Sequence, residues 1–340
     1  MQAIIWTRYG GPEGLQLQEM AQPVPKPHEI LIKIHASSVT AGDREVRSMQ
    51  IPSWVRVPMR LYVGLFRPRR VKVLGQELAG EVAALGAAVT RFRVGDPVFA
   101  ASGLRFGGYA EYICLPETGP IARKPATMSY AEAAAVPTAG LEAWHFLHKG
   151  AIRAGEKMLI NGAGGSIGTF SVQLARYVGA EVTAVDSGDK LAMLRRLGAD
   201  HVLDYTRTDF TQTGQTYDVV LDVVGTLRLS QALAVLKPAG RYLVANPSLE
   251  HKLRGPARAR AVGKQVIADP AVQTAADLDA LRGLIEAGHL KSEIDRCFPL
   301  AETAAAHRYA DSGRKQGNII ITVTPEPQAG CPARPAKPLG

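Results

Sequence analysis

The sequence predicts an α/β protein with two domains, one of which contains a doubly wound parallel sheet. Its 340 residues exceed the length of a typical single domain. Apolar runs alternate with helical patterns across residues 157–268, as in sheets that are built from βαβ units. Residues 1–120 instead carry short runs that are separated by Pro, Gly and charged residues, which predicts mostly strands.

The predicted parallel sheet begins with residues 157–186. An apolar run at 158–160 leads into a glycine-rich turn at 162–168, then into a helical pattern and a second apolar run that ends at Asp186. At the start of such a helix, unpaired backbone N–H groups can face a phosphate, and glycines allow its close approach. The carboxylate of Asp186, 24 residues after Gly162, has the spacing to accept hydrogen bonds from an adenosine ribose. We therefore expect a dinucleotide site, against the alternative of a turn that serves only tight packing.

The other predicted elements follow the same patterns. In the first domain, strands are expected at residues 3–6, 15–18, 29–37 and 81–85. Ser129 and Glu132 have the spacing of a capping box at the start of a helix over residues 129–149. Further helices are expected at residues 191–197, 229–236, 278–287 and 301–310. Further strands are expected at residues 201–203, 217–222, 240–245, 265–268, 293–298 and 318–323.

Composition restricts the class of protein and its location. No apolar stretch reaches the length of a membrane span, and residues 1–6 have the pattern of a strand rather than of a signal peptide. Cys114, Cys297 and Cys331 are odd in number and far apart, which predicts a cytoplasmic protein without a disulfide framework or a zinc knuckle. Residues 325–340 are rich in Pro and Ala and are expected to form a disordered tail.

The net charge of +9 is concentrated in two clusters. Between Arg44 and Lys72 there are eight Lys or Arg residues and a single acid, Glu45. A second cluster contains no acid and consists of Lys252, Arg254, Arg258, Arg260 and Lys264. Each cluster is either a solvated loop or the rim of a site that attracts an anionic cofactor or substrate. Nucleic acid is not favoured as a partner, because no aromatic-rich surface for RNA accompanies the charge.

Five blocks of sequence indicate a family. They are Val39-Thr40-Ala41-Gly42-Asp43, Leu74-Gly75-Gln76-Glu77-Leu78-Ala79-Gly80, Arg93-Val94-Gly95-Asp96-Pro97-Val98, Gly107-Gly108-Tyr109-Ala110-Glu111-Tyr112 and Val136-Pro137-Thr138-Ala139-Gly140. Together with the glycine turn, these blocks resemble the medium-chain dehydrogenase/reductase superfamily. The chain is most similar to its zinc-independent quinone oxidoreductase branch, and the resemblance covers residues 1–323 in the same order.

This resemblance implies a GroES-like, partly closed β-barrel catalytic domain into which a Rossmann dinucleotide-binding domain is inserted. We expect the catalytic domain at residues 1–122, the Rossmann domain at 123–270 and a return to the catalytic domain at 271–324. The resemblance places the active site in the cleft between the two domains. It also implies a homodimer, joined through the edge strand near residues 265–268.

The resemblance also bears on zinc. Members that hold a catalytic zinc bind it through Cys, His and Cys, and the matching positions here are Thr40, Gln76 and Ala135. None of these is a zinc ligand of the right kind, so we expect no metal. Without a metal, the substrate carbonyl must be polarised by conjugation or by protein donors. A quinone or an α,β-unsaturated ketone, as a small hydrophobic substrate, suits this requirement.

Four residues are candidates for contact with the reacting groups. By resemblance, Thr40 faces the nicotinamide, and its hydroxyl is the first candidate donor to the substrate oxygen. Asp43 either acts in the site or caps the helix that follows. Tyr62 is either a donor from a variable loop or an aromatic residue that packs the loop. Thr138 is expected near the nicotinamide, and water could supply the product's proton.

The glycine turn and the resemblance together define the expected cofactor site. Its residues are Thr138, Gly162, Gly164, Gly165, Ser166, Ile167, Gly168, Asp186, Ser187, Lys190, Tyr205, Val224, Gly225, Asn246 and Asn318. The charge of Asp186 would repel a 2′-phosphate and bind a free 2′-hydroxyl, which favours NADH. Ser187, Lys190 and Tyr205 could still accommodate the phosphate of NADPH.

The leading interpretation is a zinc-independent NAD(P)H-dependent reductase of quinones or α,β-unsaturated carbonyls. The alternatives are an NAD(P)-dependent alcohol dehydrogenase or carbonyl reductase, and a non-catalytic protein that binds a dinucleotide or RNA. Residues 47–73 stay open to three interpretations, because Trp54, Tyr62 and Phe66 lie there among arginines. They could line the substrate entrance, touch anionic lipid or cover the barrel.

Overall fold

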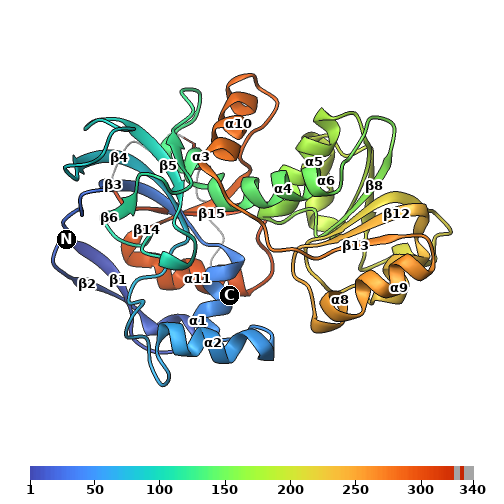
Figure 1. Ribbon diagram of the computed structural model, residues 1–340, viewed down its shortest axis with the longest axis horizontal. Helices are drawn as coiled ribbons and strands as arrows, with labels where there is room; N and C mark the ends of the chain where they lie inside the picture. The colour runs from blue at the N-terminus through green and yellow to red at the C-terminus, as the bar shows by residue number, and fades with distance from the viewer. Residues whose placement is uncertain (325–329, 333–340) are drawn as a thin grey trace. The chain divides into compact units, whose positions relative to one another are not determined.

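The computed structural model describes residues 1–324 and 330–332, and the chain divides into two compact units. Unit 1 contains Met1–Thr138, Gln273–Glu286 and Ser292–Gly340, whereas unit 2 contains Ala139–Val272 and Ala287–Lys291 (Figure 1). Unit 1 is therefore assembled from three separate stretches of chain. Such discontinuity is the expected result when one domain is inserted into another.

Unit 2 contains a six-stranded sheet in the order β10-β9-β8-β11-β12-β13. Its strands are β8 (Lys157–Asn161), β9 (Glu181–Asp186), β10 (His201–Asp204), β11 (Tyr217–Asp222), β12 (Leu236–Val244) and β13 (Gln265–Ile267). Every neighbouring pair is parallel. Numbered within the unit, this order is 3-2-1-4-5-6, the order of the doubly wound dinucleotide-binding fold. The predicted Rossmann sheet is confirmed.

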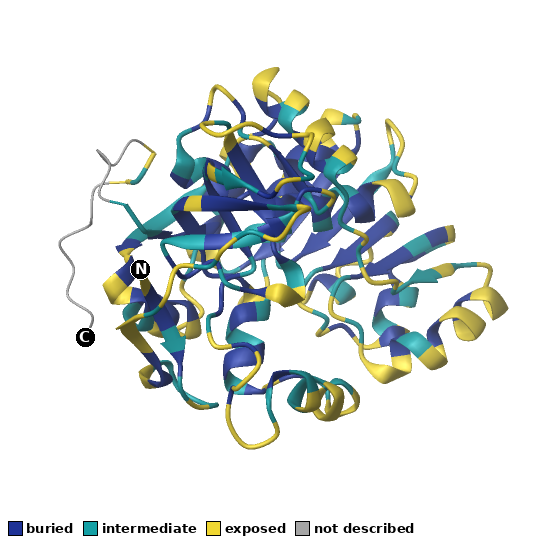
Figure 2. Cartoon of the chain, turned by 60° about the vertical axis from the view of Figure 1, so that its left-hand side comes forward, coloured by how far each residue is buried: buried dark blue, intermediate teal, exposed yellow. Residues whose placement is uncertain are grey.

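Helices cover both faces of this sheet. They are α4 (Pro137–Lys149), α5 (Ser166–Tyr177), α6 (Leu191–Leu197), α7 (Leu229–Ala234), α8 (Leu249–Leu253) and α9 (Gly255–Ala261). Because alternate side chains of a strand point to opposite faces, Ile160 joins a buried cluster with Val172 of α5 and Leu194 of α6. Its neighbour Leu159 joins a different cluster with Leu229 of α7. The central strands β8, β9 and β11 are accordingly almost entirely buried, whereas the outer strands β10 and β13 are only partly covered (Figure 2).

Unit 1 contains a seven-stranded sheet and a separate hairpin. The hairpin is β1 (Gln2–Trp6) with β2 (Leu15–Glu19), and the sheet contains β3 (Glu29–Ser38), β4 (Glu77–Leu85), β5 (Pro97–Ala101), β6 (Tyr112–Pro116), β7 (Ile121–Arg123), β14 (Ile294–Pro299) and β15 (Asn318–Thr322). The long strand β3 pairs with β4, and it also pairs with β6 through residues 29–33 and with β15 through residues 36–38. This change of partner along one strand curls the sheet into the GroES-like barrel that the sequence predicted.

The helices of unit 1 are α1 (Ala41–Ser48), α2 (Ser53–Val63), α3 (Tyr130–Ala134), α10 (Ala275–Glu286) and α11 (Thr303–Asp311). The capping box of Ser129 and Glu132 at the start of α3 is confirmed. The prediction of one helix over residues 129–149 is wrong, because the chain forms α3 and α4 with a break at residues 135–136. Pro137 lacks the backbone N–H that a continuous helix would use at that point, so it begins a new helix instead.

Three further boundaries differ from the prediction. Strand β4 begins at Glu77 rather than at residue 81, because the whole stretch pairs with β3 and β5. Helix α7 ends at Ala234 and strand β12 begins at Leu236, so Pro238 lies within a strand that has an irregular register. Helices α8 and α9 were not predicted; they contain Lys252, Arg258 and Arg260 of the second charged cluster.

The prediction of three reduced cysteines is wrong. Cys297 of β14 and Cys331 form a disulfide, so only Cys114 is free. The spacing of 34 residues gave no signal for this bond, because β15 and α11 lie between the two cysteines and bring them together only in the fold. The predicted tail lies outside the described residues except for residues 330–332. Gly330 lies beside the Ser129 side chain, so this short stretch contacts the start of α3.

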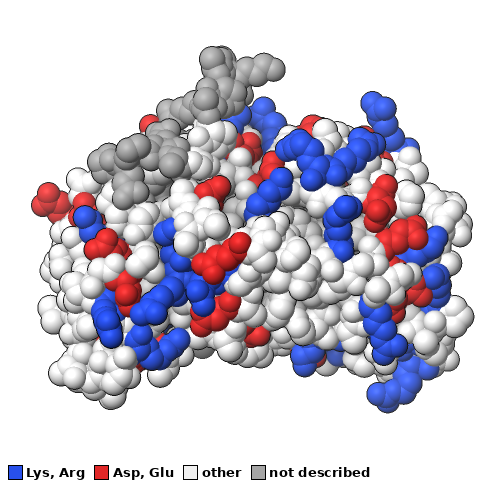
Figure 3. Space-filling model, turned by 90° about the horizontal axis from the view of Figure 1, so that it is seen from above, with Lys and Arg blue, Asp and Glu red and all other residues white. Residues whose placement is uncertain are grey.

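The described residues contain no helix with both the length and the apolar character needed to cross a membrane. On the face shown in Figure 3, basic and acidic side chains are interspersed. In the second basic cluster, Arg258 forms an ion pair with Glu250 at 2.6 Å, and Lys264 donates to the Leu233 carbonyl. These residues are therefore partly neutralised by their own surroundings.

Candidate functional site

The glycine turn of unit 2 contains residues that the backbone geometry requires. Gly162 has a φ of +82°, and a Cβ there would lie 2.5 Å from Val224. A Cβ on Gly168 would lie 2.4 Å from the Gly162 carbonyl oxygen and 2.5 Å from the Ala163 Cα. Both glycines therefore allow β8, the turn and α5 to pack closely. This is the packing role that the sequence left as an alternative, and it is present.

Gly165 differs from these two glycines. It is the N-cap of α5, its φ is −86°, and the nearest atom to a Cβ would lie 3.6 Å away. No side chain caps the helix at this residue. Space is therefore left beside Gly165, at the start of the 12-residue helix α5, and no side chain occupies it. This arrangement, with Ser166, Ile167 and Gly168 in the first turn, fits the pyrophosphate of a dinucleotide.

Asp186 lies at the end of β9, where the sequence predicted it, and its carboxylate is already engaged. One oxygen accepts a hydrogen bond from the Gly164 N–H at 2.7 Å. The other accepts from the Ser187 N–H at 2.8 Å and lies 2.9 Å from the Lys190 Nζ. Both partners of the ion pair are buried. Asp186 thus fixes the glycine turn to β9, and Lys190 offsets its charge.

The other predicted residues near the ribose end lie on the rim of this site. The Ser187 hydroxyl donates to Asp189 at 2.6 Å. The Tyr205 side chain is exposed, and its backbone N–H donates to the Asp186 carbonyl. Tyr205 therefore keeps its phenol free to meet a ligand, whereas Ser187 shares its hydroxyl with an acid.

A buried acid that the sequence analysis did not assign organises the adjacent strand end. Asp222, at the end of β11, accepts hydrogen bonds from Asn161 Nδ2 and the Gly225 N–H, each at 2.9 Å. It also accepts from the Leu227 N–H and the Tyr242 hydroxyl. The signal was present, because this acid ends a predicted strand just as Asp186 does.

Asp222 thereby holds the loop that contains Val224 and Gly225. A Cβ on Gly225 would lie 2.2 Å from the Asn246 carbonyl oxygen, so three predicted cofactor residues come together here. Val224 is also the neighbour of Gly162. The carboxyl ends of β8, β9, β11 and β12 therefore present the predicted cofactor residues of unit 2 along one edge of the sheet, where doubly wound folds bind ligands.

In unit 1, Thr40 and Asp43 form the capping box of α1. The Thr40 hydroxyl accepts from the Asp43 N–H at 3.0 Å and lies 2.7 Å from an Asp43 oxygen. Asp43 also accepts hydrogen bonds from the Gly75 N–H at 2.9 Å and the Tyr109 hydroxyl at 3.2 Å. Asp43 is fully buried, and it joins α1 to two other segments of the chain. The capping role of Asp43 is present.

Burial shifts the titration of this cluster. Loss of water raises the pKa of Asp43, although hydrogen bonds from Thr40 and Gly75 oppose the shift. Burial, together with the nearby Asp43 charge, raises the pKa of Tyr109 well above its ordinary value. The Tyr109 hydroxyl lies 3.2 Å from His307 Nε2, and burial lowers the pKa of that imidazole to about 3. Tyr109 and His307 were not singled out as site residues, because they come from distant parts of the sequence.

Glu77 is a second buried acid of unit 1. It accepts hydrogen bonds from the Ser38 hydroxyl and, at 2.6 Å, from the Thr138 N–H. Burial raises the pKa of Glu77 to about 7, and the nearby Asp43 adds to the rise. Glu77 thus fixes the backbone of Thr138, the residue that was expected near the nicotinamide.

Two predicted site residues have structural partners of their own. The Tyr62 hydroxyl donates to the Leu104 carbonyl at 3.0 Å, and the Arg70 guanidinium lies over the Tyr62 ring. Asn318 is buried in β15, and its side-chain amide donates to the Glu293 carbonyl at 3.0 Å. Tyr62 lies in helix α2 rather than in the expected loop, and its side chain holds this helix against residue Leu104, whereas Asn318 joins β15 to the start of β14.

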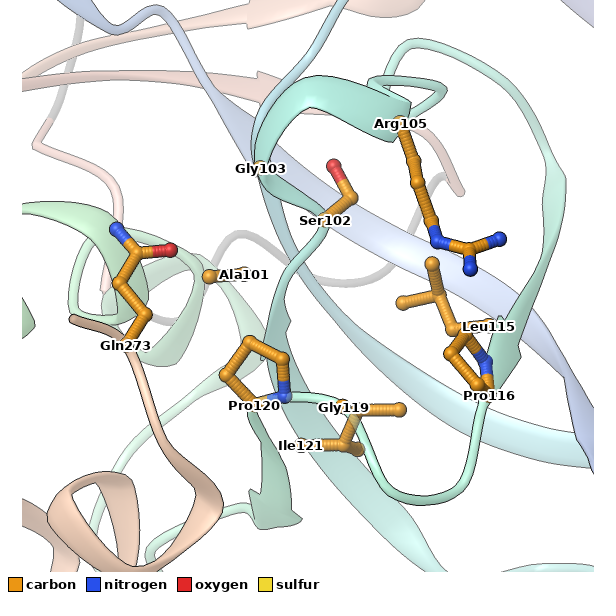
Figure 4. A pocket seen from close by; sticks show the side chains of 10 residues that line it. All are labelled: Ala101, Ser102, Gly103, Arg105, Leu115, Pro116, Gly119, Pro120, Ile121 and Gln273. Atoms are coloured by element: carbon orange, nitrogen blue, oxygen red, sulfur yellow. The ribbon is translucent and has the colours of Figure 1, made fainter.

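A hollow of about 200 Å³ in unit 1 lies apart from all these residues (Figure 4). It is lined by Ala101, Ser102, Gly103, Arg105, Leu115, Pro116, Gly119, Pro120, Ile121 and Gln273. None of the predicted site residues contributes to it, and the Ser102 hydroxyl is bonded to the Gly75 carbonyl. It is also smaller than most ligand sites, so we do not assign it to the reaction.

Comparison with known proteins covers both units. A family model described as an alcohol dehydrogenase GroES-like domain matches residues 26–126, and one described as a zinc-binding dehydrogenase matches residues 197–321. A quinone oxidoreductase of Pseudomonas aeruginosa is 30% identical over 336 residues, which covers 94% of this chain and 98% of that protein. The chain belongs to the medium-chain dehydrogenase/reductase superfamily.

Two further relatives place it in the quinone oxidoreductase-like branch of this superfamily. The 2-methylene-furan-3-one reductase of Solanum lycopersicum is 30% identical over 340 residues, which covers 96% of this chain and 80% of that protein. The structure of the quinone oxidoreductase from Coxiella burnetii has a TM-score of 0.85 and 28% identity, and it covers 95% of this chain and 99% of that one. As a medium-chain reductase, the protein is an oxidoreductase with a nicotinamide cofactor.

One family description names zinc, so the corresponding positions of this medium-chain reductase matter. The Thr40 hydroxyl lies 2.9 Å from Gln76 Oε1, so the structure brings two of the three positions together. The third, Ala135, is buried at the end of α3. A hydroxyl, an amide and a methyl group do not make a set of zinc ligands. Across residues 1–324 and 330–332, no group of three His, Cys, Asp or Glu side chains could hold a metal ion.

Proposed function

We propose that this protein is a zinc-independent NAD(P)H-dependent reductase of quinones or α,β-unsaturated carbonyl compounds. The observation that carries the proposal is the residue set Thr40, Gln76 and Ala135 at the positions where zinc-dependent relatives hold their metal. This set can accept and donate hydrogen bonds but cannot polarise an alcohol oxygen as a metal does. The substrates named for the relatives from Pseudomonas aeruginosa and Solanum lycopersicum support the same class.

The reaction needs only hydride, a proton and orientation. When bound, the dinucleotide supplies hydride from its nicotinamide. A quinone then takes one hydride and one proton to become a hydroquinone, and the dinucleotide loses two electrons. In an enone, hydride adds to the β-carbon, negative charge develops on the carbonyl oxygen, and a proton then adds at the α-carbon to give the saturated carbonyl compound. The protein therefore has to orient both molecules and stabilise that oxygen.

The Thr40 hydroxyl is our first candidate for this stabilisation. It has one proton, and in this structure both Asp43 and Gln76 lie within hydrogen-bond distance of it. Donation to a substrate would leave these two groups in place as the scaffold of Thr40. Thr40→Val should therefore lower kcat with a smaller effect on KM, and Thr40→Ser should restore much of the loss. An equal loss in both variants would assign Thr40 to structure alone.

We propose that the Asp186–Lys190 ion pair sets the choice of cofactor. Asp186 disfavours a 2′-phosphate, which favours NADH, and Lys190 reduces this effect because it offsets the charge. Lys190→Ala should raise the NADH to NADPH ratio of kcat/KM by about tenfold, and Asp186→Ser should shift it the other way. A strong preference of the wild-type protein for NADPH would contradict our interpretation of Asp186.

We also propose a homodimer through β13. This strand forms one end of the unit 2 sheet, so its outer edge has backbone groups that a second copy could pair with. Sedimentation velocity should give the mass of two chains. Val266→Pro, in the middle of this short edge strand, should then yield a monomer, and an unchanged mass would reject this interface.

A substrate panel tests the function directly. Initial rates with quinones, enones, aldehydes and primary alcohols, each with both cofactors, should show turnover of quinones or enones only. The same protein should be assayed for bound metal. Turnover of a primary alcohol together with stoichiometric zinc would instead identify an alcohol dehydrogenase.

A further inference from the structure

Helix α2 in unit 1 has two apolar faces, and only one is used for packing. Val55, Met59 and Tyr62 pack against a buried cluster of unit 1. Val57 and Leu61 point away from it and are 63% and 70% exposed. A helix of a folded domain normally has a polar outer face, so this second apolar face requires an explanation.

The apolar surface continues beyond the helix. Gly64 ends α2 with a φ of +146°, a conformation that lets the chain turn sharply. The next two residues, Leu65 and Phe66, are 51% and 88% exposed. Trp54, at the other end of the helix, is 42% exposed. Exposed large apolar side chains thus recur between residue 54 and residue 66.

Positive charge surrounds this apolar surface. The chain has no acidic residue from position 46 to position 76. Arg56, Arg67, Arg69, Arg70 and Lys72 are all exposed, and none of them forms an ion pair with another described residue. Their charge is therefore available to an anionic partner.

Three of these basic residues also line a hollow. It has a volume of about 490 Å³, is open to solvent, and has Arg67, Arg69 and Lys72 among its lining residues. Trp6 of β1 also lines it, and the buried Nε1 of Trp6 has no hydrogen-bond partner among the described residues. The hollow is large enough for the phosphate head group of a lipid, next to the exposed apolar residues that follow α2.

We propose that residues 53–72, which we term the α2 surface, dock this protein on an anionic lipid bilayer. Apolar side chains on one face of a helix, flanked by arginines, are the features that place a helix at the headgroup boundary of a membrane. Juxtaposed basic residues add attraction to anionic lipids. The α2 surface (Figure 1, pale blue) is independent of the residues that we assign to the reaction, except that Tyr62 packs its inner side.

The charge argues against a second copy of the chain as the occupant. A symmetric dimer through this surface would place the same arginines against each other. The absence of any acid from position 46 to position 76 leaves nothing within the surface to pair with them. A bilayer of anionic lipid satisfies the apolar and the basic residues together.

Flotation with large unilamellar vesicles tests this proposal. The full-length protein should bind vesicles of phosphatidylcholine mixed with phosphatidylglycerol, should not bind pure phosphatidylcholine, and should dissociate at high salt. Val57→Glu with Leu61→Glu should weaken binding at least about tenfold because the apolar face is lost. Arg67→Gln with Arg69→Gln should weaken it at least about tenfold because two cationic contacts are lost.

A matched control uses exposed residues outside the α2 surface. Val24→Glu with Lys26→Gln changes one exposed apolar and one exposed basic residue of unit 1 and should leave binding unchanged. Thermal melting checks that each variant folds. If the double glutamate variant does not fold, the double glutamine variant and the salt dependence of binding still test the proposal. Equal binding by the variants and the control would overturn it, as would equal affinity for both kinds of vesicle.

Two further outcomes would identify a different occupant. If glycerol 3-phosphate displaces the protein from vesicles as effectively as lipid does, the surface binds a free phosphate and the proposal fails. If sedimentation without lipid shows a dimer that the glutamate pair dissociates, the occupant is a second copy and the proposal also fails.

Discussion

The glycine turn of unit 2 and the polar cluster of unit 1 are built in opposite ways. The turn presents backbone to a ligand, and the strand, turn, helix and acid that form it lie within 30 residues of sequence, from Lys157 to Asp186. The cluster of Thr40, Asp43, Tyr109 and His307 combines side chains from three distant segments, and its members hydrogen-bond to one another. A site that binds its ligand through backbone groups tolerates few substitutions at the glycines that expose them. A site that acts through side chains depends on the hydrogen bonds that fix the positions of those side chains.

The largest expected effect follows from this contrast and concerns the glycine turn. Gly168→Ala places a Cβ against backbone atoms at 2.4–2.5 Å, and should destabilise the protein by about 3 kcal/mol or more. Gly165→Ala meets no atom closer than 3.6 Å, so it should keep stability and weaken dinucleotide binding at least about tenfold. Urea unfolding and calorimetry with NADH measure the two quantities. Similar stability of both variants would show that the turn is not constrained by packing.

Asp43 gives the matching test in unit 1. Asp43→Ala leaves the backbone N–H groups of Gly75 and Thr40 buried without an acceptor, which should cost at least about 3 kcal/mol in the free energy of unfolding. Asp43→Asn keeps the shape and one acceptor oxygen and should cost less. If alanine changes kcat but leaves urea unfolding unchanged, Asp43 belongs to the reaction rather than to the scaffold.

In unit 1, the buried carboxyl group of Glu77 should make stability depend on pH. Burial raises the pKa of Glu77 from 4.5 in the unfolded chain to about 7, so the folded state keeps a proton that the unfolded state has lost. Stability should therefore be greatest below pH 4.5 as far as this group is concerned, and should fall by about 3 kcal/mol as the pH rises to 7.

Glu77→Gln should remove that part of the pH dependence. Urea unfolding of both proteins at several pH values across this window provides the measurement. Glu142, whose pKa burial also raises to about 7, stays in both proteins, so the difference between them isolates Glu77. Parallel curves for the two proteins would mean that Glu77 is already charged in the folded state.

The smallest expected effect is a stabilisation away from both regions. Gly283 lies in α10, and a Cβ there would meet no atom within 4 Å. Gly283→Ala should raise the free energy of unfolding by up to about 1 kcal/mol, because alanine favours a helix over glycine. Cofactor affinity should not change; a change would show that α10 affects the dinucleotide site.

The same contrast explains what the sequence could predict. The order of strands and helices around Gly162 and Asp186 follows from periodicity and turn residues, which are local, and it agrees with the structure. Tyr109 and His307 could not be predicted as partners, because 198 residues separate them and only the fold brings them together. Likewise, no local pattern connects Cys297 with Cys331. The ion pair between Asp186 and Lys190 also depends on the burial of both side chains, which sequence spacing alone does not predict.

The central claim is that hydride passes from the dinucleotide to a quinone or enone without a metal. The most direct measurement uses protein that has been treated with a strong chelator and analysed for residual zinc. This protein should be mixed with NADH deuterated at the transferring position of the nicotinamide and with an enone substrate. We predict that deuterium appears on the carbon of the saturated product that was the β-carbon of the enone, at the same rate as with untreated protein. A rate that disappears with the zinc and returns when zinc is added would contradict the account.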